Sequence, residues 1–444
     1  MPRTIESGTD DVLAARTPNT GSAKPLGGSI ARTADAPRAV VCFSGSRDHY
    51  QLPWALAEAG LLEKLVTDLY IDPARIPFGQ AIAKRRPNFA ARCSPGLSHR
   101  QVIAPLLTGL NSLLMRTPLG SRSRQIGLDR SIGRRARRES WKSQTALFSY
   151  SYYAAAAFAA GVTRPRLRFL FQLHPHPATV RKILQQEKQA SPRFAVSLQW
   201  EHEIGAPPEH FAALCQEPLM ANGWVVASSF TAATLVENGV RRDEIHIIPY
   251  GVDFATYPCR DCPPASHAPF RVMWIGSMTQ RKGLSYFLEA VGSLPQDNLE
   301  VLICGHHAVD RSVIEQSRIK SIRVLRGLPT AELASELRKA DLFVLPSLAE
   351  GFGHVILEAM SSGVPVLTTG ATCAPDVLTD GEHGFIVPPR DSRSLAEAIK
   401  WGMAHRSQLY GMGLSAAAQA RKFTWERFRA SIVKAYKKMV ERNA

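Results

Sequence analysis

Short apolar runs alternate with longer amphipathic segments along most of this chain. The run Ala39–Phe43, the amphipathic segment Gln51–Glu63 and the run Leu65–Tyr70 predict a strand, a helix and a second strand. Further apolar runs of the first half follow, mostly at helix-length intervals: Leu106–Leu114 with helical spacing, then Ala146–Phe148, Phe169–Leu173, Phe194–Leu198, Trp224–Ala227 and Ile245–Pro249. Alternation of this kind predicts a mostly parallel sheet with helices on both faces.

A second series of runs begins after a proline-rich segment without periodicity, Tyr257–Pro269. Its members are Phe270–Ile275, Leu299–Cys304, Ile322–Leu325, Leu342–Leu345, Val364–Leu367 and Phe385–Val387. They predict a second doubly wound unit, and Trp425–Val440 predicts a basic amphipathic helix after it. The expected fold is therefore α/β, with two Rossmann-like domains facing across a cleft at the carboxyl ends of their strands.

These patterns predict how the 444 residues are divided. Residues 1–37 lack periodicity and are expected to be disordered. The first domain is placed at 38–252, a linker at 253–269, the second domain at 270–422 and a final helical segment at 423–444.

The most informative stretch runs from Ala340 to Thr369. It reads as a buried strand ending in a polar loop with Glu350, then a Gly-Phe-Gly turn and a helix bearing Glu358. The helix N-terminus offers backbone N–H groups to an anion, and the carboxylates accept hydrogen bonds from hydroxyls. Such a pair suits a ligand with both hydroxyls and phosphates, and we favour a nucleotide sugar. The alternative is a solvated loop acid and an exposed helix acid.

A small, cationic loop follows the strand Phe270–Ile275. Gly276 allows close approach of the backbone to a ligand, Lys282 supplies a mobile positive charge, and Arg281 adds a fork of donors. Because the loop lies between a strand and a predicted helix, it suits a diphosphate. An exposed, solvated Arg-Lys pair is the alternative.

Two segments of the first half also follow predicted strands and are expected to face the cleft. His174 follows Phe169–Leu173 and could donate a hydrogen bond to a substrate hydroxyl, although a surface histidine is the commoner case. The loop Ser44–Tyr50 follows the first strand, and its candidate contacts with an acceptor are Gly45, Asp48, His49 and Tyr50.

The net charge of +16 is concentrated in one region. Residues 71–140 hold 14 Lys and Arg but only three acidic residues, so we expect this segment to meet anionic partners such as membrane phospholipid or a lipid diphosphate. A solvated, arginine-rich insertion is the alternative. Only Phe78 and Phe89 are aromatic there, which disfavours nucleic acid.

Neither the cysteines nor the chain start indicates secretion. The first residues, MPRTIESGTDD, carry no apolar signal core, and no apolar run approaches the length of a bilayer span. Seven cysteines suit a reducing compartment, and Cys259-x-x-Cys262 lacks a second pair at metal-ligand spacing. The expected location is the cytoplasm, with peripheral association on the inner face of the membrane.

These motifs resemble the family 4 retaining glycosyltransferases, which have the GT-B fold (glycosyl transferases group 1). The similarity covers about 245–425 well and the first domain more loosely. Its strongest element is E-x7-E, from Glu350 to Glu358; I-P-x-G-V-D at Ile248–Asp253 and R-K-G at Arg281–Gly283 support it. Many relatives carry arginine where this chain has Ser277, and we expect Arg281 to replace it.

The resemblance implies roles for these residues. It implies that Glu350 binds hydroxyls of the donor sugar and Glu358 the nucleotide ribose, while Lys282 and Arg281 neutralise the leaving diphosphate without a bound metal or cofactor. The remaining donor contacts are expected from Gly276, Ser277, Gly351, Phe352, Gly353 and His354. His174 is expected to contact the sugar or acceptor, and 423–444 to cross back to the acceptor-binding first domain.

The implied activity is transfer of a sugar, with retention, from a UDP-, GDP- or ADP-linked donor to a hydroxyl acceptor, including lipid-linked acceptors of polysaccharide or glycolipid synthesis. Two alternatives stay open on the same architecture. One is a nucleotide-sugar epimerase, which needs no separate acceptor. The other is a non-catalytic module that binds nucleotide sugars.

Overall fold

The computed structural model describes residues 36–75, 92–105, 122–161, 165–265, 267–305 and 311–443. The predicted disorder of 1–37 falls almost wholly outside these residues, as do the run Leu106–Leu114 and much of the basic region 71–140. Residues 36–444 form one compact unit that contains two sheets. We call each sheet, together with the helices and loops that connect its strands, a lobe, the first and the second in chain order. The predicted domain bounds within this unit stay a prediction.

The first lobe is built on a seven-stranded parallel sheet of order β3-β2-β1-β4-β5-β6-β7. Its strands are β1 Ala39–Cys42, β2 Leu62–Val66, β3 Val102–Ile103, β4 Ala146–Tyr150, β5 Arg168–Gln172, β6 Gly223–Val226 and β7 Ile245–Ile247. Every residue of β1, β4 and β6 is buried, which explains why these strands read as continuous apolar runs. The order reverses at β1 and β4.

The second lobe repeats this plan in a six-stranded parallel sheet of order β10-β9-β8-β11-β12-β13. Its strands are β8 Phe270–Ile275, β9 Leu299–Cys304, β10 Ile322–Leu325, β11 Leu342–Leu345, β12 Val366–Thr369 and β13 Gly384–Val387. The order reverses between β8 and β11, the strands that precede the cationic loop and the Glu350 loop. The prediction of two doubly wound sheets is confirmed.

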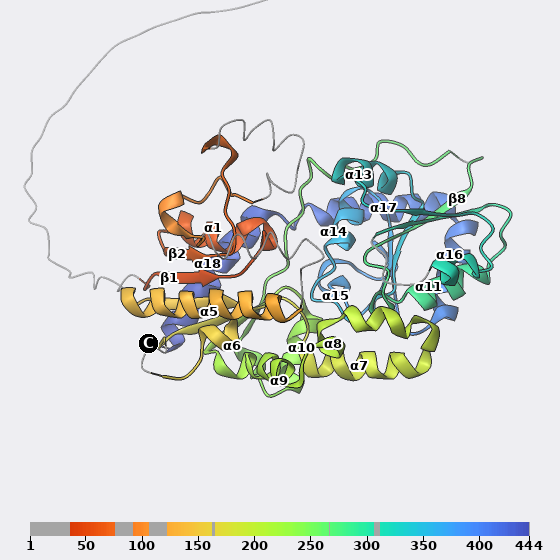
Figure 1. The fold of residues 1–444 in the computed structure, drawn as a ribbon. Helices are drawn as coiled ribbons and strands as arrows, with labels where there is room; N and C mark the ends of the chain where they lie inside the picture. The colour runs from red at the N-terminus through yellow and green to blue at the C-terminus, as the bar shows by residue number, and fades with distance from the viewer. Residues whose placement is uncertain are drawn as a thin grey trace, which may run out of the picture. The chain divides into compact units, whose positions relative to one another are not determined.

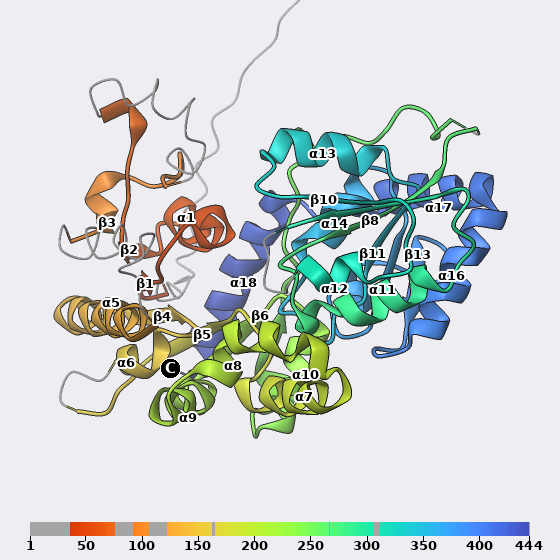
Figure 2. The same ribbon diagram turned by 45° about the vertical axis from the view of Figure 1, so that its right-hand side comes forward.

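Helices cover both sheets (Figure 1). Those of the first lobe are α1 Gln51–Glu58, α5 Arg122–Ser143, α6 Ala154–Ala157, α7 Pro177–Ala190, α8 His202–Gly205, α9 Pro208–Gln216 and α10 Ser229–Glu237. Those after β8 are α11 Leu284–Gly292, α12 Arg311–Glu315, α13 Thr330–Arg338, α14 His354–Ser361, α15 Ala374–Val377, α16 Ser392–Ala404, α17 Arg406–Ala420 and α18 Trp425–Asn443. Turned by 45°, the ribbon shows α11 and α16 in front of the second sheet (Figure 2). No helix of the described ranges combines the length and apolar character that crossing a bilayer requires.

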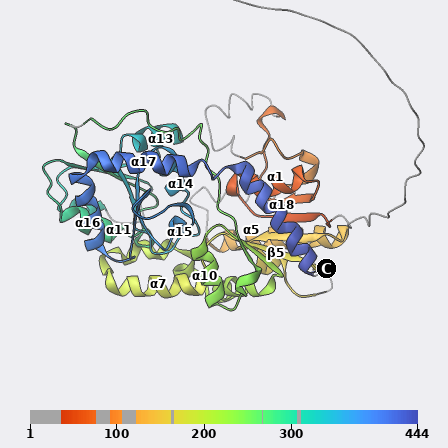
Figure 3. The ribbon, with the colours of Figure 1, turned by 180° about the vertical axis from the view of Figure 1, so that it is seen from behind.

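The last helix belongs to the first lobe by its contacts. Seen from behind, α18 lies across the first sheet beside α1 (Figure 3). The Tyr436 ring is fully buried, stacks on Phe148 and meets Phe169 edge to face, and its hydroxyl donates to the Pro37 carbonyl at 2.5 Å. The chain therefore crosses back from the second sheet to the first.

Four predicted elements of the pattern need correction. The helix expected at Gln51–Glu63 ends at Glu58, because Gly60 turns the chain at φ 70°, and the next strand starts at Leu62 rather than Leu65. The run Phe194–Leu198 lies in a 3₁₀ helix, Pro192–Trp200, and not in a strand.

The predicted strand Val364–Leu367 begins two residues later, at Val366. Pro365 lacks an N–H group for the ladder, although its carbonyl accepts from Phe343 N–H at 3.0 Å.

The docking of α18 can be tested with Tyr436→Ala. We expect a loss of about 3 to 5 kcal/mol in the free energy of unfolding, because an aromatic ring is removed from a filled core. Tyr436→Phe keeps the ring and is expected to cost only about 1 kcal/mol, the net value of one hydrogen bond. Urea unfolding at pH 7 measures both, and equal, small losses for the two variants would contradict the docking of this helix.

Candidate active site

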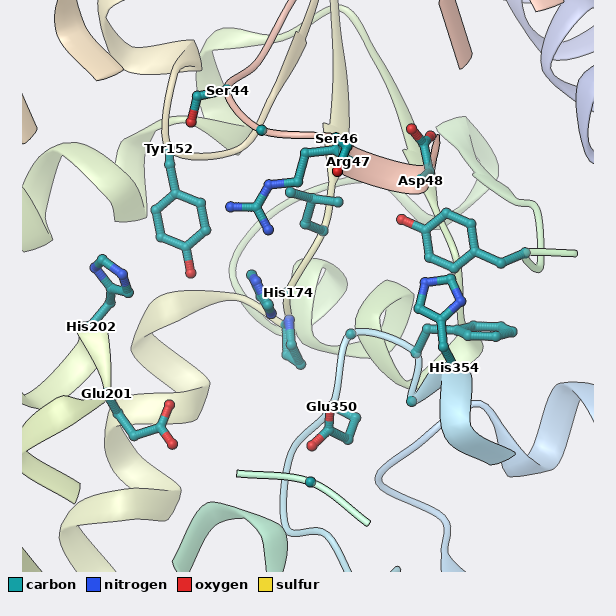
Figure 4. A pocket seen from close by; sticks show the side chains of 18 of the residues that line it. Ser44, Ser46, Arg47, Asp48, Tyr152, His174, Glu201, His202, Glu350 and His354 are labelled. Atoms are coloured by element: carbon teal, nitrogen blue, oxygen red, sulfur yellow. The ribbon is translucent and has the colours of Figure 1, made fainter. Parts of the chain in front are cut away.

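The loops that follow the strands at both reversals line one cavity of about 1210 Å³. The first lobe contributes the loops after β1, β4 and β5, and the second lobe contributes those after β8 and β11. Open parallel sheets bind ligands at this position, because the loops after neighbouring strands diverge there. Figure 4 shows the side chains that converge on the cavity from the two lobes.

An ion cluster forms the wall of the cavity on the second lobe. Glu350 Oε1 accepts from Lys282 Nζ at 2.6 Å and from an Arg281 terminal nitrogen at 2.8 Å. Arg281 Nε donates to Glu201 Oε2 of the first lobe at 2.9 Å. Glu350 Oε2 forms no hydrogen bond with a described residue, and Lys282 has two further N–H donors.

The electrostatics of the cluster follow from burial and close pairing. Burial alone would raise the pKa of Glu350, but Lys282 and then Arg281 outweigh it and lower this pKa to about 2. Burial lowers the pKa of Lys282, and Glu350 opposes the change. Glu350 is therefore a carboxylate at neutral pH, because only the charged form pairs with the two cations.

Glycines allow the two second-lobe loops to approach each other. Gly283 has φ 70°, and a Cβ at this position would lie 2.0 Å from the Pro346 carbonyl oxygen. The Leu348 N–H donates to the Arg281 carbonyl at 2.8 Å. The close contact fixes the cationic loop against the Glu350 loop, which explains why the cations and the acid meet.

The Gly-Phe-Gly turn contacts the first lobe directly. A Cβ on Gly351 would lie 1.8 Å from the Leu173 carbonyl oxygen at the end of β5. The Gly351 carbonyl accepts from the hydroxyls of Ser228 and Thr231 at 2.7 and 3.1 Å. The turn then leads into α14, whose first residues, His354 and Val355, line the cavity.

Glu358 lies in the second turn of α14 and lines the same cavity. Burial raises the pKa of Glu358 to about 7, and a hydrogen bond with the Tyr257 hydroxyl opposes this rise. Unlike Glu350, it makes no ion pair with a described residue. Near neutral pH it can therefore exchange between the acid and the carboxylate.

His174 faces the cluster from the end of β5 (Figure 4). Burial, Arg47 and Arg281 lower the pKa of His174 to about 3. The imidazole is therefore neutral at pH 7, with one donor and one acceptor nitrogen, and can exchange a hydrogen bond with a hydroxyl.

The loop after β1 has an unusual backbone. Asp48, His49 and Tyr50 have φ values of 41°, 52° and 62°, a region that non-glycine residues seldom occupy. Residues held in this way cost about 1 to 3 kcal/mol each and cluster at functional sites. The Tyr150 hydroxyl donates to Asp48 Oδ2 at 2.5 Å, and burial raises the pKa of Asp48 to about 7.

Most of the predicted site residues line this cavity. The exceptions are Ser277, which is exposed outside it, and Tyr50, whose ring is buried in the first-lobe core against Phe43. The left-handed turn directs Tyr50 inward, so the cleft position expected for it is not observed. The lining residues among the predicted set are Gly45, Asp48, His49, His174, Gly276, Arg281, Lys282, Glu350, Gly351, Phe352, Gly353, His354 and Glu358.

The structure adds residues that the motifs did not indicate. Arg47 reaches into the cavity between Tyr152 and His174, and it makes no ion pair with a described residue (Figure 4). Glu201 and His202 follow a 3₁₀ helix, where no strand or glycine signal marks a site. Arg47 follows a strand, as the predicted residues do, and this signal could have identified it.

Comparison with known proteins finds a family match within the second lobe. Residues 269–405 match the family model Glycosyl transferases group 1. The D-inositol 3-phosphate glycosyltransferase of Corynebacterium efficiens is 28% identical over 256 residues, which cover 52% of this chain and 60% of that protein. The phosphatidyl-myo-inositol mannosyltransferase of Mycobacterium leprae is 29% identical over 49% of this chain and 56% of its own length. The matches thus span little more than half of these relatives.

Solved structures match over nearly the whole chain and show the fold. Sucrose-phosphate synthase from Thermosynechococcus elongatus aligns with a TM-score of 0.60 and 17% identity, covering 90% of this chain and 98% of that one. Anabaena HepE in complex with UDP-glucose aligns with a TM-score of 0.56 and 15% identity over 90% and 100% of the two chains. The GT-B architecture is confirmed.

The ion cluster makes a prediction about stability. We expect Glu350→Gln to lower the free energy of unfolding by about 3 kcal/mol at pH 7, because two buried cations lose their shared carboxylate. The folded pKa lies below the ordinary value of 4.5, so the stabilisation is complete above that value and is lost as the pH falls from about 5 towards 2. The difference between variant and wild type should shrink over that range.

Urea unfolding at several pH values measures this difference. Glu397→Gln is the matched control, because Glu397 forms an exposed pair with Arg393 that contributes little to stability. An effect of Glu350→Gln no larger than that of the control would contradict the tight pairing.

Proposed function

We propose that this protein, whose residues 269–405 belong to the Glycosyl transferases group 1 family, is a glycosyltransferase that moves a sugar from a nucleoside diphosphate sugar to a hydroxyl acceptor with retention of configuration. The observation that carries the proposal is that Lys282 and Arg281 both contact Glu350 Oε1, at 2.6 and 2.8 Å. The three side chains lie beside the N-terminus of α14. Cations and free helix amides in this cavity match the diphosphate of such a donor, and the carboxylate matches its sugar hydroxyls.

The donor is proposed to bind along the second-lobe wall. Lys282 donates its two free N–H groups to the diphosphate, and Arg281 adds its fixed charge nearby. Glu350 Oε2 accepts from a sugar hydroxyl, while Oε1 holds the two cations in place. Glu358 accepts from the ribose hydroxyls. No metal is required in this scheme, because the two cations supply the charge for the leaving group.

Transfer is proposed to occur on one face of the sugar. The bond between C1 and the diphosphate oxygen breaks, and its electron pair leaves with the diphosphate. The acceptor oxygen bonds to C1 from the same side, and its proton passes to a leaving phosphate oxygen. Glu350 is poorly suited to act as a covalent nucleophile, because its carboxylate is paired with two cations.

The acceptor is proposed to bind to the first-lobe wall. His174 and Asp48 provide polar groups for hydroxyls there, and Arg47 provides a positive charge. A lipid-linked acceptor and peripheral association with an anionic membrane through 71–140 belong to the same proposal. Its support in the described residues is α5, which carries seven arginines along its length. The inner face of the membrane is the proposed location.

Lys282→Ala tests the donor site through catalysis. We expect release of nucleoside diphosphate from a panel of UDP-, GDP- and ADP-sugars to slow about a hundredfold or more, because one preorganised charge on the leaving group is lost. Lys320→Ala is the control, since Lys320 is an exposed lysine of the same lobe, paired with Asp297. Turnover of Lys282→Ala within about threefold of the control would overturn the assignment.

Calorimetry with UDP, GDP and ADP tests the ribose contact. We expect the preferred nucleotide to bind about fivefold to tenfold more tightly at pH 8 than at pH 6, because Glu358, with its pKa near 7, becomes a full acceptor only when deprotonated. Glu358→Gln should bind more weakly and lose this part of the pH dependence, which separates it from titration of the phosphate. Failure of all three nucleotides to bind would contradict the enzyme proposal.

A further inference from the structure

A second hollow, of about 240 Å³, lies between helices α5, α6 and α9. The ribbon shows α6 and α9 on the same side of α5 in both views (Figures 1 and 2). Tyr152 lines this hollow and also the main cavity. The two spaces therefore lie on either side of this one side chain.

Three arginines form one side of the hollow. Arg130, Arg134 and Arg137 are spaced by four and three residues on α5, so they share one face of the helix. None of them makes an ion pair with a residue that the structure describes. Two of them donate to backbone carbonyls: Arg134 to the carbonyl of Arg130 at 3.4 Å and Arg137 to that of Ala159 at 3.5 Å.

The rest of the lining combines small side chains with Tyr152, His210, Leu214 and Glu217. Alanines of α6 and α9 line the hollow, and Gly133 brings α5 close to α6, since a Cβ there would lie 2.5 Å from the Tyr153 carbonyl oxygen. Larger side chains at the alanine positions would fill the space. The hollow is thus a product of small residues beneath a row of guanidinium groups.

The acidic residue at the hollow does not neutralise these arginines. Glu217 is buried, and its two oxygens accept from the N–H groups of Tyr152 and Ala155 at 2.7 and 2.9 Å. Burial raises the pKa of Glu217 to about 8, so this acid is mostly uncharged at pH 7. His210, also buried at the hollow, is neutral at pH 7, because burial and Arg130 lower its pKa to about 4. The charge facing the hollow is therefore positive.

We propose that this hollow binds a phosphate group, as a phosphomonoester or diphosphate, carried by the acceptor. The inference rests on the proposed function. Guanidinium forks match phosphate oxygens in pairs, and three of them suit a group with more than one negative charge. Asp129, which lines the main cavity, directly precedes Arg130 on α5, and Arg137 lies about 12 Å further along the helix, so the row of arginines leads away from the main cavity.

Binding of inorganic pyrophosphate tests the hollow. Calorimetry at 0.15 M salt should show two classes of site in the wild type, one in the main cavity and one in the hollow. Arg130→Gln/Arg137→Gln should lose one class, with at least a tenfold fall in affinity, and keep the other. The single variant Arg130→Gln should show the same change in smaller degree. Because Arg130 is exposed, this substitution is expected to leave the fold intact, so it tests the site even if the double variant is unstable.

The matched control is Arg135→Gln/Arg138→Gln. These arginines are exposed on the same helix and carry the same charge, but they line a different surface hollow. The control should keep both classes of site. Equal losses in the two double variants would show general attraction to a basic helix and overturn the proposal, as would unchanged binding in Arg130→Gln/Arg137→Gln.

Vesicles distinguish a lipid source of the phosphate from a soluble one. In flotation with phosphatidylcholine vesicles that contain phosphatidic acid, a larger loss for Arg130→Gln/Arg137→Gln than for the control indicates a lipid headgroup in the hollow. Equal flotation of the two variants, with the pyrophosphate difference retained, indicates a soluble phosphorylated acceptor.

Nucleoside diphosphate binding, measured on the same proteins, keeps the two proposals separate. We expect Arg130→Gln/Arg137→Gln to bind the preferred nucleotide with wild-type affinity. Loss of pyrophosphate at the hollow with intact nucleotide binding supports the phosphate site. Absence of nucleotide binding in every protein, including the wild type, overturns the proposed function instead.

Discussion

Two cations cannot lie side by side in a buried wall unless a carboxylate lies between them. Glu350 meets this condition for Lys282 and Arg281, and the second-lobe wall of the cavity depends on it. The arrangement keeps both positive charges in place before any ligand arrives, so little reorganisation is needed when a diphosphate develops charge. Arg281 also pairs with Glu201 of the other lobe, which links this wall to the opposite one.

Contacts between the lobes reinforce that link through backbone atoms. Gly351 lies against the end of β5, and Ser228 donates to its carbonyl. Nearby, Asp376 of the second lobe accepts from the N–H and hydroxyl of Ser229, at 2.8 and 3.0 Å. The start of α10 in the first lobe is thus hydrogen-bonded to Gly351 and Asp376 of the second lobe. Gly351 itself lines the ligand cavity.

Much of the fold could be predicted from the sequence, because parallel strands are buried on both faces. The strands Phe270–Ile275 and Leu342–Leu345 have the predicted bounds, since their apolar runs end at polar loops. Phe194–Leu198 was assigned wrongly, because a short apolar run does not by itself distinguish a strand from a helical turn.

Local geometry also limited the site prediction. A left-handed turn directs Tyr50 into the core, and Glu201 reaches Arg281 only through tertiary packing.

The crossing of α18 has a consequence for how the protein is made. Tyr436 lies against Phe148 and Phe169, and Met439 lies next to Gly223, so the core of the first sheet includes side chains that the ribosome adds almost two hundred residues after β7. During synthesis the core of the first lobe therefore stays incomplete, with part of its apolar surface uncovered, until the second lobe and α18 have been translated. Domains of most chains fold in order from the N-terminus as they emerge. Here the order is reversed at the last step, and the first lobe is completed after the second.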